Sequence, residues 1–176
     1  MLLLGLTVVA IWVGLLAFRG GFWRTAPPLP ACFAAARSVV AVIPARDEAG
    51  FIGGAVASLL AQDHPGDLHV VVVDDSSGDG TADAARAAGQ PGRVTVVAGA
   101  PMPPGWTGKL WALRQGVAVA ARMRPDYLLL TDADIVHAPG NVRGLVARAE
   151  GEEYDLVSLM VRLHCKGFWE RLLVPA

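Results

Sequence analysis

The chain has 176 residues, which suits one domain with a substantial core, and 53% of them are hydrophobic, with a mean hydropathy of +0.44. Its net charge of −1 gives no support for nucleic-acid binding. The two cysteines, Cys32 and Cys165, form neither a zinc-ligand spacing nor a disulfide framework, which is typical of a reducing compartment.

The first 18 residues carry no charge and are apolar almost throughout. Extended to residue 23, this run is long enough to predict a single transmembrane anchor over residues 1–23. Arg19, Arg24 and Arg37 follow the run, whereas no basic residue precedes it. This asymmetry predicts that the N-terminus lies outside the membrane and the rest of the chain in the cytoplasm. A cleaved signal peptide is the weaker interpretation, because a basic N-terminal region is missing.

Beyond a Pro-rich linker over residues 24–37, strand-like and helix-like stretches alternate. The expected strands cover residues 38–43, 68–73, 94–98, 127–131 and 156–162, with Pro44 stopping the first. The expected helices cover residues 51–62, 81–88, 109–123 and 139–149. The pattern predicts an α/β domain over residues 38–165, a Rossmann-like and mostly parallel sheet with helices on both faces. Residues 166–176 are expected to begin a membrane-proximal segment of a longer protein.

Two of the expected strands end in carboxylates. Asp74 and Asp75 follow one apolar run, and Asp132 and Asp134 follow another. Ligands of open α/β sheets bind beyond the carboxyl ends of the strands. Carboxylates there are costly to desolvate unless a cation or ligand compensates their charge. The pattern therefore predicts a divalent metal that carries a diphosphate.

Smaller signals have competing interpretations. The turn at residues 75–80 matches the early positions of a calcium loop, but Arg86 stands where that loop needs glutamate. Lys109 opens a helix between glycines and could meet a phosphate, although it is not in a Walker loop and could be an ordinary surface lysine. Trp106 and Trp111 could stack on a ligand or pack in the core. His137 could approach a metal.

Four motifs in sequence order resemble those of inverting family-2 glycosyltransferases with the GT-A fold. They are Pro44-Ala-Arg-Asp-Glu48, Asp75 with Ser77, Asp79 and Thr81, Gly108-Lys-Leu-Trp-Ala-Leu113, and Asp132-Ala-Asp134. The resemblance covers residues 38–165. The stretch around Lys109 and the apolar N-terminus are most similar to the hopanoid-biosynthesis-associated branch, which is related to ceramide glucosyltransferases.

This resemblance implies a UDP-sugar donor, a lipid acceptor at the bacterial inner membrane and a Mg²⁺ or Mn²⁺ cofactor. It implies a metal site at Asp134 and Asp132, with Asp132 also meeting the diphosphate. The other donor-binding residues that it implies are Pro44, Ala45, Glu48, Asp74, Asp75 and Lys109. The family's catalytic aspartate and its Gln/Arg-x-x-Arg-Trp motif do not occur before Ala176, so the catalytic base is expected beyond this residue.

Three alternatives remain open at this level. The Asp132-Ala-Asp134 run also fits the nucleophile motif of haloacid-dehalogenase-type phosphatases, but their acidic metal-binding pair comes later in the sequence, and here Asp74 and Asp75 come first. A nucleotidyltransferase could begin with a similar first strand, although Asp47 and Glu48 after that strand would repel a triphosphate. The third alternative is a non-catalytic nucleotide-sugar-binding membrane module.

Overall fold

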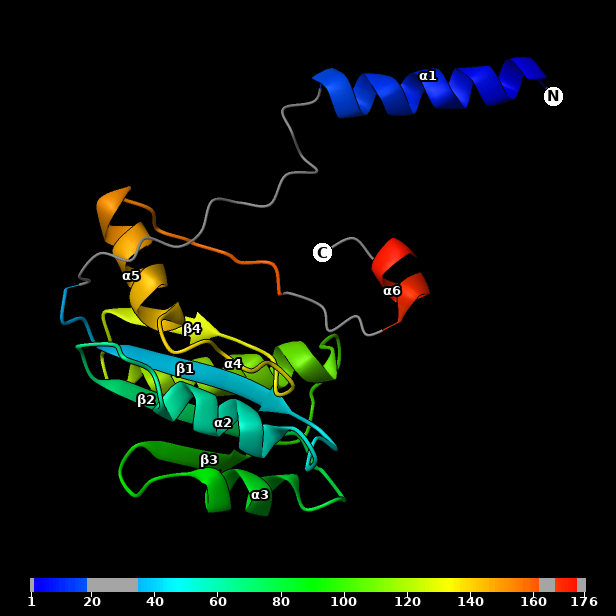
Figure 1. Ribbon diagram of the computed structural model, residues 1–176. Helices are drawn as coiled ribbons and strands as arrows, with labels where there is room; N and C mark the ends of the chain where they lie inside the picture. Colours follow the sequence, from blue (N-terminus) through cyan, green and yellow to red (C-terminus); the bar gives the residue numbers. More distant parts are fainter. Residues whose placement is uncertain (1, 19–34, 162–166, 174–176) are drawn as a thin grey trace. The chain divides into compact units, whose positions relative to one another are not determined.

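The computed structural model describes residues 2–18, 35–161 and 167–173 (Figure 1). The chain divides into two compact units, one over residues 29–159 and one formed by residues 1–28 and 160–176. The predicted linker over residues 24–37 falls mostly outside the described residues, as do Cys32 and Cys165.

The larger unit is an α/β fold with four parallel strands in the order β3-β2-β1-β4 (Figure 1). The strands are β1 (Val39–Ala45), β2 (Leu68–Asp74), β3 (Val94–Ala98) and β4 (Tyr127–Leu130). The helices are α2 (Ile52–Leu60), α3 (Thr81–Ala88), α4 (Gly108–Ala121) and α5 (Asn141–Gly151). The predicted parallel sheet is confirmed, and so are the four predicted helices, with ends that shift by at most two residues.

Helices cover both faces of this sheet, as predicted. Alternate residues of a strand point to opposite faces, and every residue of β1 from Val39 to Ile43 is buried. Val39, Ala41 and Ile43 pack with side chains of α2, α3 and α5. Val40 and Val42 pack with α4 on the other face. The uninterrupted apolar runs of β1 and β2 are therefore explained by burial on two sides.

Helix α4 approaches the sheet closely at Gly116. A Cβ atom at this position would overlap the side chain of Val42 and would lie 3.0 Å from Val73 Cγ2. Because glycine has no Cβ, the helix can pack directly on β1 and β2. This close packing fixes the direction of α4, whose N-terminus reaches the carboxyl end of the sheet.

The first strand continues through Pro44, so the prediction that Pro44 stops it was wrong. Pro44 pairs in register with Val73, and β1 ends at Ala45. In β1 the main chain of Val42 faces β4, because Val42 O accepts a hydrogen bond from Thr131 N–H. Pro44, two residues on, faces the same side. Since β4 ends at Leu130, opposite Val42, no strand there requires the N–H that proline lacks.

The fifth strand predicted over residues 156–162 is not found, and this prediction is corrected for residues 156–161, which the structure describes without a strand. Leu156 is 84% exposed and Met160 is 96% exposed. A strand needs a neighbouring strand for its main-chain hydrogen bonds, and this segment pairs with none within the described chain.

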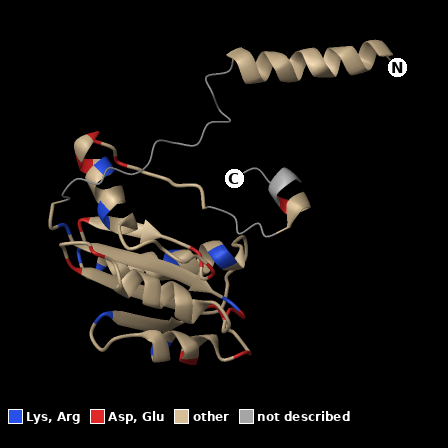
Figure 2. Ribbon diagram, in the orientation of Figure 1, with Lys and Arg blue, Asp and Glu red and all other residues tan. Residues whose placement is uncertain are grey.

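The smaller unit contains α1 (Leu2–Phe18) and α6 (Phe168–Leu173). Helix α1 carries no charged residue (Figure 2). Within the described residues, no helix combines the length and the apolar character needed to cross a membrane. In the described part of the predicted anchor, α1 has 17 residues, whereas a span needs about 20. Residues 19–23 lie outside the described part of the chain.

Candidate active site

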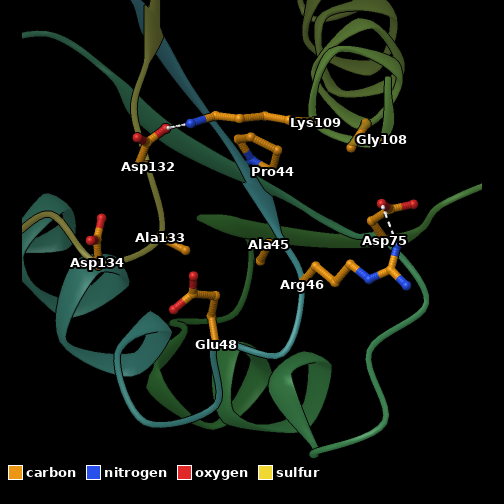
Figure 3. A pocket seen from close by; sticks show the side chains of 11 residues that line it. Pro44, Ala45, Arg46, Glu48, Asp75, Gly108, Lys109, Asp132, Ala133 and Asp134 are labelled. Atoms are coloured by element: carbon orange, nitrogen blue, oxygen red, sulfur yellow. Dashed lines mark ion pairs between the residues drawn. The ribbon is translucent and has the colours of Figure 1, made fainter. Parts of the chain in front are cut away.

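A cavity of about 370 Å³ opens at the carboxyl end of the sheet (Figure 3). Residues from the ends of β1, β2 and β4 and from the N-terminus of α4 line it: Pro44, Ala45, Arg46, Glu48, Asp75, Gly108, Lys109, Ala112, Asp132, Ala133 and Asp134. Every predicted donor or metal residue except Asp74 belongs to this set. The structure thus brings together side chains up to 90 positions apart in the sequence, from Pro44 to Asp134.

The loop after β1 is held by the loop after β2. Thr81 is fully buried, and its Oγ1 accepts a hydrogen bond of 2.8 Å from the backbone N–H of Glu48. The carboxylate of Asp79 accepts hydrogen bonds from the backbone N–H groups of Ala49, at 2.9 Å, and of Thr81, at 3.0 Å. The Thr81 hydroxyl also donates to Asp79, and this hydrogen bond is the main reason why the pKa of Asp79 lies below its usual value.

Asp47 lies in the same loop with φ of 53°, a left-handed conformation that is uncommon for a residue other than glycine. Its backbone N–H donates to Ser77 Oγ at 3.0 Å, and its Oδ1 accepts from Gly78 N–H at 2.9 Å. These reciprocal hydrogen bonds compensate for the unfavourable backbone conformation. Ser77, Asp79 and Thr81 thus support the loop that presents Glu48, and none of them lines the cavity.

Asp75 is a largely enclosed carboxylate of the cavity, with 15% of its side chain exposed. Its backbone N–H donates to Ala45 O at 2.8 Å, which ties the ends of β1 and β2 together. Arg46 Nη1 lies 3.6 Å from its Oδ2 atom. A Cβ atom on Gly108 would lie 3.0 Å from the same oxygen, so glycine at position 108 lets the N-terminus of α4 approach this carboxylate closely.

Asp132 and Asp134 lie on the opposite wall, and both are exposed (Figure 3). Ala133 between them is buried and packs in the core, so it fixes the backbone while its two neighbours remain accessible. Lys109 Nζ lies 2.8 Å from Asp132 Oδ1 across the cavity. Asp134 forms no ion pair with any residue that the structure describes.

The oxygen atoms of these carboxylates fit a hard divalent cation such as Mg²⁺ or Mn²⁺. Within the described residues, however, no group of three or more His, Cys, Asp or Glu side chains is placed to hold a metal. Asp132 and Asp134 alone leave most coordination positions of such an ion unfilled. The site therefore fits a metal that arrives with further oxygen ligands, such as those of a diphosphate, better than a permanently bound ion.

Four of the candidates proposed from the sequence do not line the cavity: Asp74, His137, Trp106 and Trp111. The carboxylate of Asp74 accepts a hydrogen bond from the N–H of Ser77, in its own turn, at 3.4 Å. His137 Nδ1 lies 2.8 Å from Asn141 Nδ2 and its Nε2 lies 3.1 Å from Thr131 Oγ1, so both ring nitrogens already have partners. Burial lowers the pKa of His137, which favours the neutral ring.

The two tryptophans pack against each other rather than line the cavity. Trp111 donates its indole N–H to Ala100 O at 2.9 Å, and its ring meets that of Trp106 edge-on, with centroids 5.4 Å apart. The Arg114 guanidinium lies over both rings. Arg46 and Gly108 also line the cavity, although the sequence predicts no site role for either of them.

The sequence matches Glycosyl transferase family 2 over residues 40–174. This match covers most of the chain, and the protein therefore belongs to glycosyltransferase family 2. A comparison with curated proteins finds no match.

Solved structures of similar fold agree with the family. The mannosyltransferase PcManGT of Pyrobaculum calidifontis, in complex with GDP-Man and Mn²⁺, is 26% identical with a TM-score of 0.59, and the alignment covers 83% of this chain and 42% of that one. Glucosyl-3-phosphoglycerate synthase of M. tuberculosis is 28% identical with a TM-score of 0.50, covering 64% of this chain and 40% of the other. TarS of S. aureus, at 20% identity and a TM-score of 0.52, covers 66% and 33% and shares the fold. The chain thus spans less than half the length of each.

Proposed function

We propose that this protein binds a UDP-sugar together with Mg²⁺ or Mn²⁺ and takes part in an inverting transfer of the sugar to a lipid acceptor. The observation that carries the proposal is the convergence of Asp75, Lys109, Asp132 and Asp134 on one cavity at the carboxyl end of the sheet. Membership of glycosyltransferase family 2 supports a nucleotide-sugar donor.

Each wall of the cavity has a separate task in this proposal. Asp75 accepts a hydrogen bond from the N3–H group of uracil, and Glu48 accepts hydrogen bonds from the ribose. Pro44 and Ala45 form the floor against which the nucleoside lies. These residues lie at the ends of β1 and β2, where open α/β sheets generally bind nucleotides.

The opposite wall binds the diphosphate. Asp134, and with it Asp132, holds the metal ion, and Lys109 donates to a phosphate oxygen. When bound, the metal offsets the negative charge that develops on the departing UDP. The base that deprotonates the acceptor hydroxyl is proposed to lie beyond Ala176, because no described carboxylate other than those of the cavity faces this space.

A lipid acceptor is the finer part of the proposal. Its support is the uncharged helix α1 and the exposed apolar side chains of Leu156, Met160, Phe168 and Trp169. Apolar surface of this kind favours association with lipid. The hopanoid-type acceptor, which the sequence resemblance implies, and the membrane anchor over residues 1–23, which the apolar run predicts, remain proposals.

The test is calorimetric titration of UDP into the full chain, with and without Mn²⁺. We expect Mn²⁺ to tighten UDP binding, and we expect Asp134→Ala to abolish this gain, a loss of about tenfold or more. Asp83→Ala is the matched control, because Asp83 is exposed on α3 and pairs only with Arg86 among the described residues. Equal Mn²⁺ dependence in wild type and Asp134→Ala would refute the metal assignment.

The same titration with GDP and CDP tests the base. PcManGT was solved with GDP-Man, so the choice between uracil and guanine is a real alternative. Cytosine has no N3–H group from which Asp75 could accept a hydrogen bond, so CDP is expected to bind most weakly. Tighter binding of GDP than of UDP would replace uridine by guanosine in the proposal. Binding of none of the three would reject the donor site altogether.

A further inference from the structure

The ion pair between Lys109 and Asp132 connects two elements that the proposed donor must also contact. Lys109 Nζ lies 2.8 Å from Asp132 Oδ1, and the two side chains are 63% and 52% exposed. Figure 3 shows the lysine extending from the start of α4 across the cavity to the wall formed after β4. In this state the lysine ammonium is paired with Asp132, which is one of the two proposed metal ligands.

The position of Lys109 in its helix is unfavourable for the helix itself. It is the second residue of α4, and the first turn of this helix contains no acidic residue. A cation near a helix N-terminus is repelled by the partial positive charge of the helix dipole. Helix stability therefore does not explain a lysine here, whereas an anion bound at this helix end would be attracted by both the lysine and the dipole.

We propose that Lys109 is an internal counter-ion of the empty site, which holds Asp132 until a metal-bound diphosphate arrives and thereby makes metal binding depend on the donor. The proposal rests on the proposed function, because it concerns the same metal and diphosphate. A divalent ion and the ammonium group compete for one carboxylate, and Asp134 alone binds such an ion weakly.

The donor resolves this competition because it brings negative charge. When a diphosphate enters, Lys109 exchanges the Asp132 carboxylate for a phosphate oxygen, and Asp132 becomes free for the metal. No covalent bond changes in this step. Since both partners are exposed, their ion pair contributes little free energy, so the exchange meets no large barrier. Lys109 is thus a positioning residue that couples two ligands.

The experiment titrates Mn²⁺ into the full chain without nucleotide. Electron paramagnetic resonance measures the concentration of free Mn²⁺ at each step. Lys109→Met removes the charge and keeps the length of the side chain. It is expected to bind Mn²⁺ about fivefold more tightly than wild type. Lys109→Arg retains the ion pair and should bind like wild type.

Arg122→Met is the matched control, because it removes one positive charge from the exposed C-terminal end of the same helix. It is expected to leave Mn²⁺ affinity unchanged, and a gain equal to that of Lys109→Met would reduce the effect to net charge and overturn the proposal. Circular dichroism confirms that each variant is folded before its titration is interpreted.

A second titration separates this proposal from the proposed function. UDP binding is measured with and without Mn²⁺, and the ratio of the two affinities should fall about fivefold in Lys109→Met. If wild type binds UDP with Mn²⁺ but Lys109→Met shows no gain for Mn²⁺ alone, the counter-ion role is wrong and the donor site stands. If wild type binds no nucleotide, the proposed function fails and this proposal fails with it.

Discussion

The two walls of the cavity are built differently. On the wall after β1 and β2, Asp75 is nearly enclosed, and five hydrogen bonds between the neighbouring loops fix the backbone around Glu48. On the wall after β4, both carboxylates are exposed, and the ion pair with Lys109 holds one of them. β4 is also a short edge strand, whereas β1 and β2 lie inside the sheet.

This difference indicates a division of labour. A wall whose loops are fixed by several hydrogen bonds loses little entropy when it binds a ligand, which suits recognition of a base of fixed shape. An exposed wall of carboxylates can rearrange when a metal and a diphosphate arrive. The comparison predicts that substitutions in the hydrogen-bonded loops after β1 and β2 affect folding, whereas substitutions of the carboxylates after β4 affect ligand binding with little effect on folding.

The largest expected effect is on the rigid wall. Thr81→Val removes the hydroxyl that accepts from Glu48 N–H and donates to Asp79, inside a fully buried position. It should lower the free energy of unfolding by about 1–3 kcal/mol, because the part-buried N–H of Glu48 loses its partner. Urea unfolding measures the change. Thr81→Ser keeps the hydroxyl and should lose less, and equal losses would show that the hydrogen bonds contribute nothing.

The second substitution displaces Asp75 without touching the loops. Gly108→Ala places a Cβ atom 3.0 Å from Asp75 Oδ2, a tight contact that requires this carboxylate to shift by a few tenths of an ångström. UDP affinity should fall about tenfold with little change in stability, as calorimetry and thermal unfolding would show. Gly50→Ala is the control, since a Cβ atom there meets no other residue within 4 Å among those described. Unchanged UDP affinity in Gly108→Ala would contradict the assignment of Asp75.

The third substitution sharpens the contrast from the exposed wall. Asp132→Asn breaks the ion pair with Lys109 at a position that is half exposed. The free energy of unfolding should change by no more than about 0.5 kcal/mol, because exposed ion pairs contribute little. A loss as large as that of Thr81→Val would show that both walls are structural and would remove the distinction between them.

The smallest expected effect concerns pH. Burial lowers the pKa values of His69 and His137 from the ordinary value of 6.5. The unfolded chain therefore binds protons at these rings more readily than the folded chain, and stability should decline as the pH falls from above 6.5 to below it. Unfolding midpoints measured over this range should vary less in a variant with His69→Gln and His137→Gln. An identical pH profile would exclude these two rings as its source.

Much of the fold follows from local patterns in the sequence. The apolar runs of β1 and β2 predict strands buried on both faces, and the alternation with helices predicts the parallel sheet. The strand end predicted at Pro44 was wrong. Proline usually ends a strand, but here the neighbouring β4 ends before Pro44, so no partner requires the missing N–H. The expected strand over residues 156–162 has a suitable composition, but strand formation depends on a partner that composition cannot reveal.

The candidate site shows the same limit. Asp75, Asp132 and Asp134 could be chosen from their places at strand ends, because parallel strands deliver their carboxyl ends to one edge. Asp74 could not be separated from Asp75 in this way, although the structure turns it toward Ser77. The pairing of Lys109 with Asp132 depends on how closely α4 packs on the sheet, which Gly116 determines through contacts distant in sequence.

The central claim is that the carboxylates after β2 and after β4 bind one ligand between them. A crystal structure of the full chain with UDP and Mn²⁺ tests it most directly. The account predicts uracil against Asp75, Mn²⁺ on Asp134 and the diphosphate between them beside Lys109. A nucleotide bound elsewhere, or Mn²⁺ bound away from Asp134 while UDP fills the cavity, would contradict it.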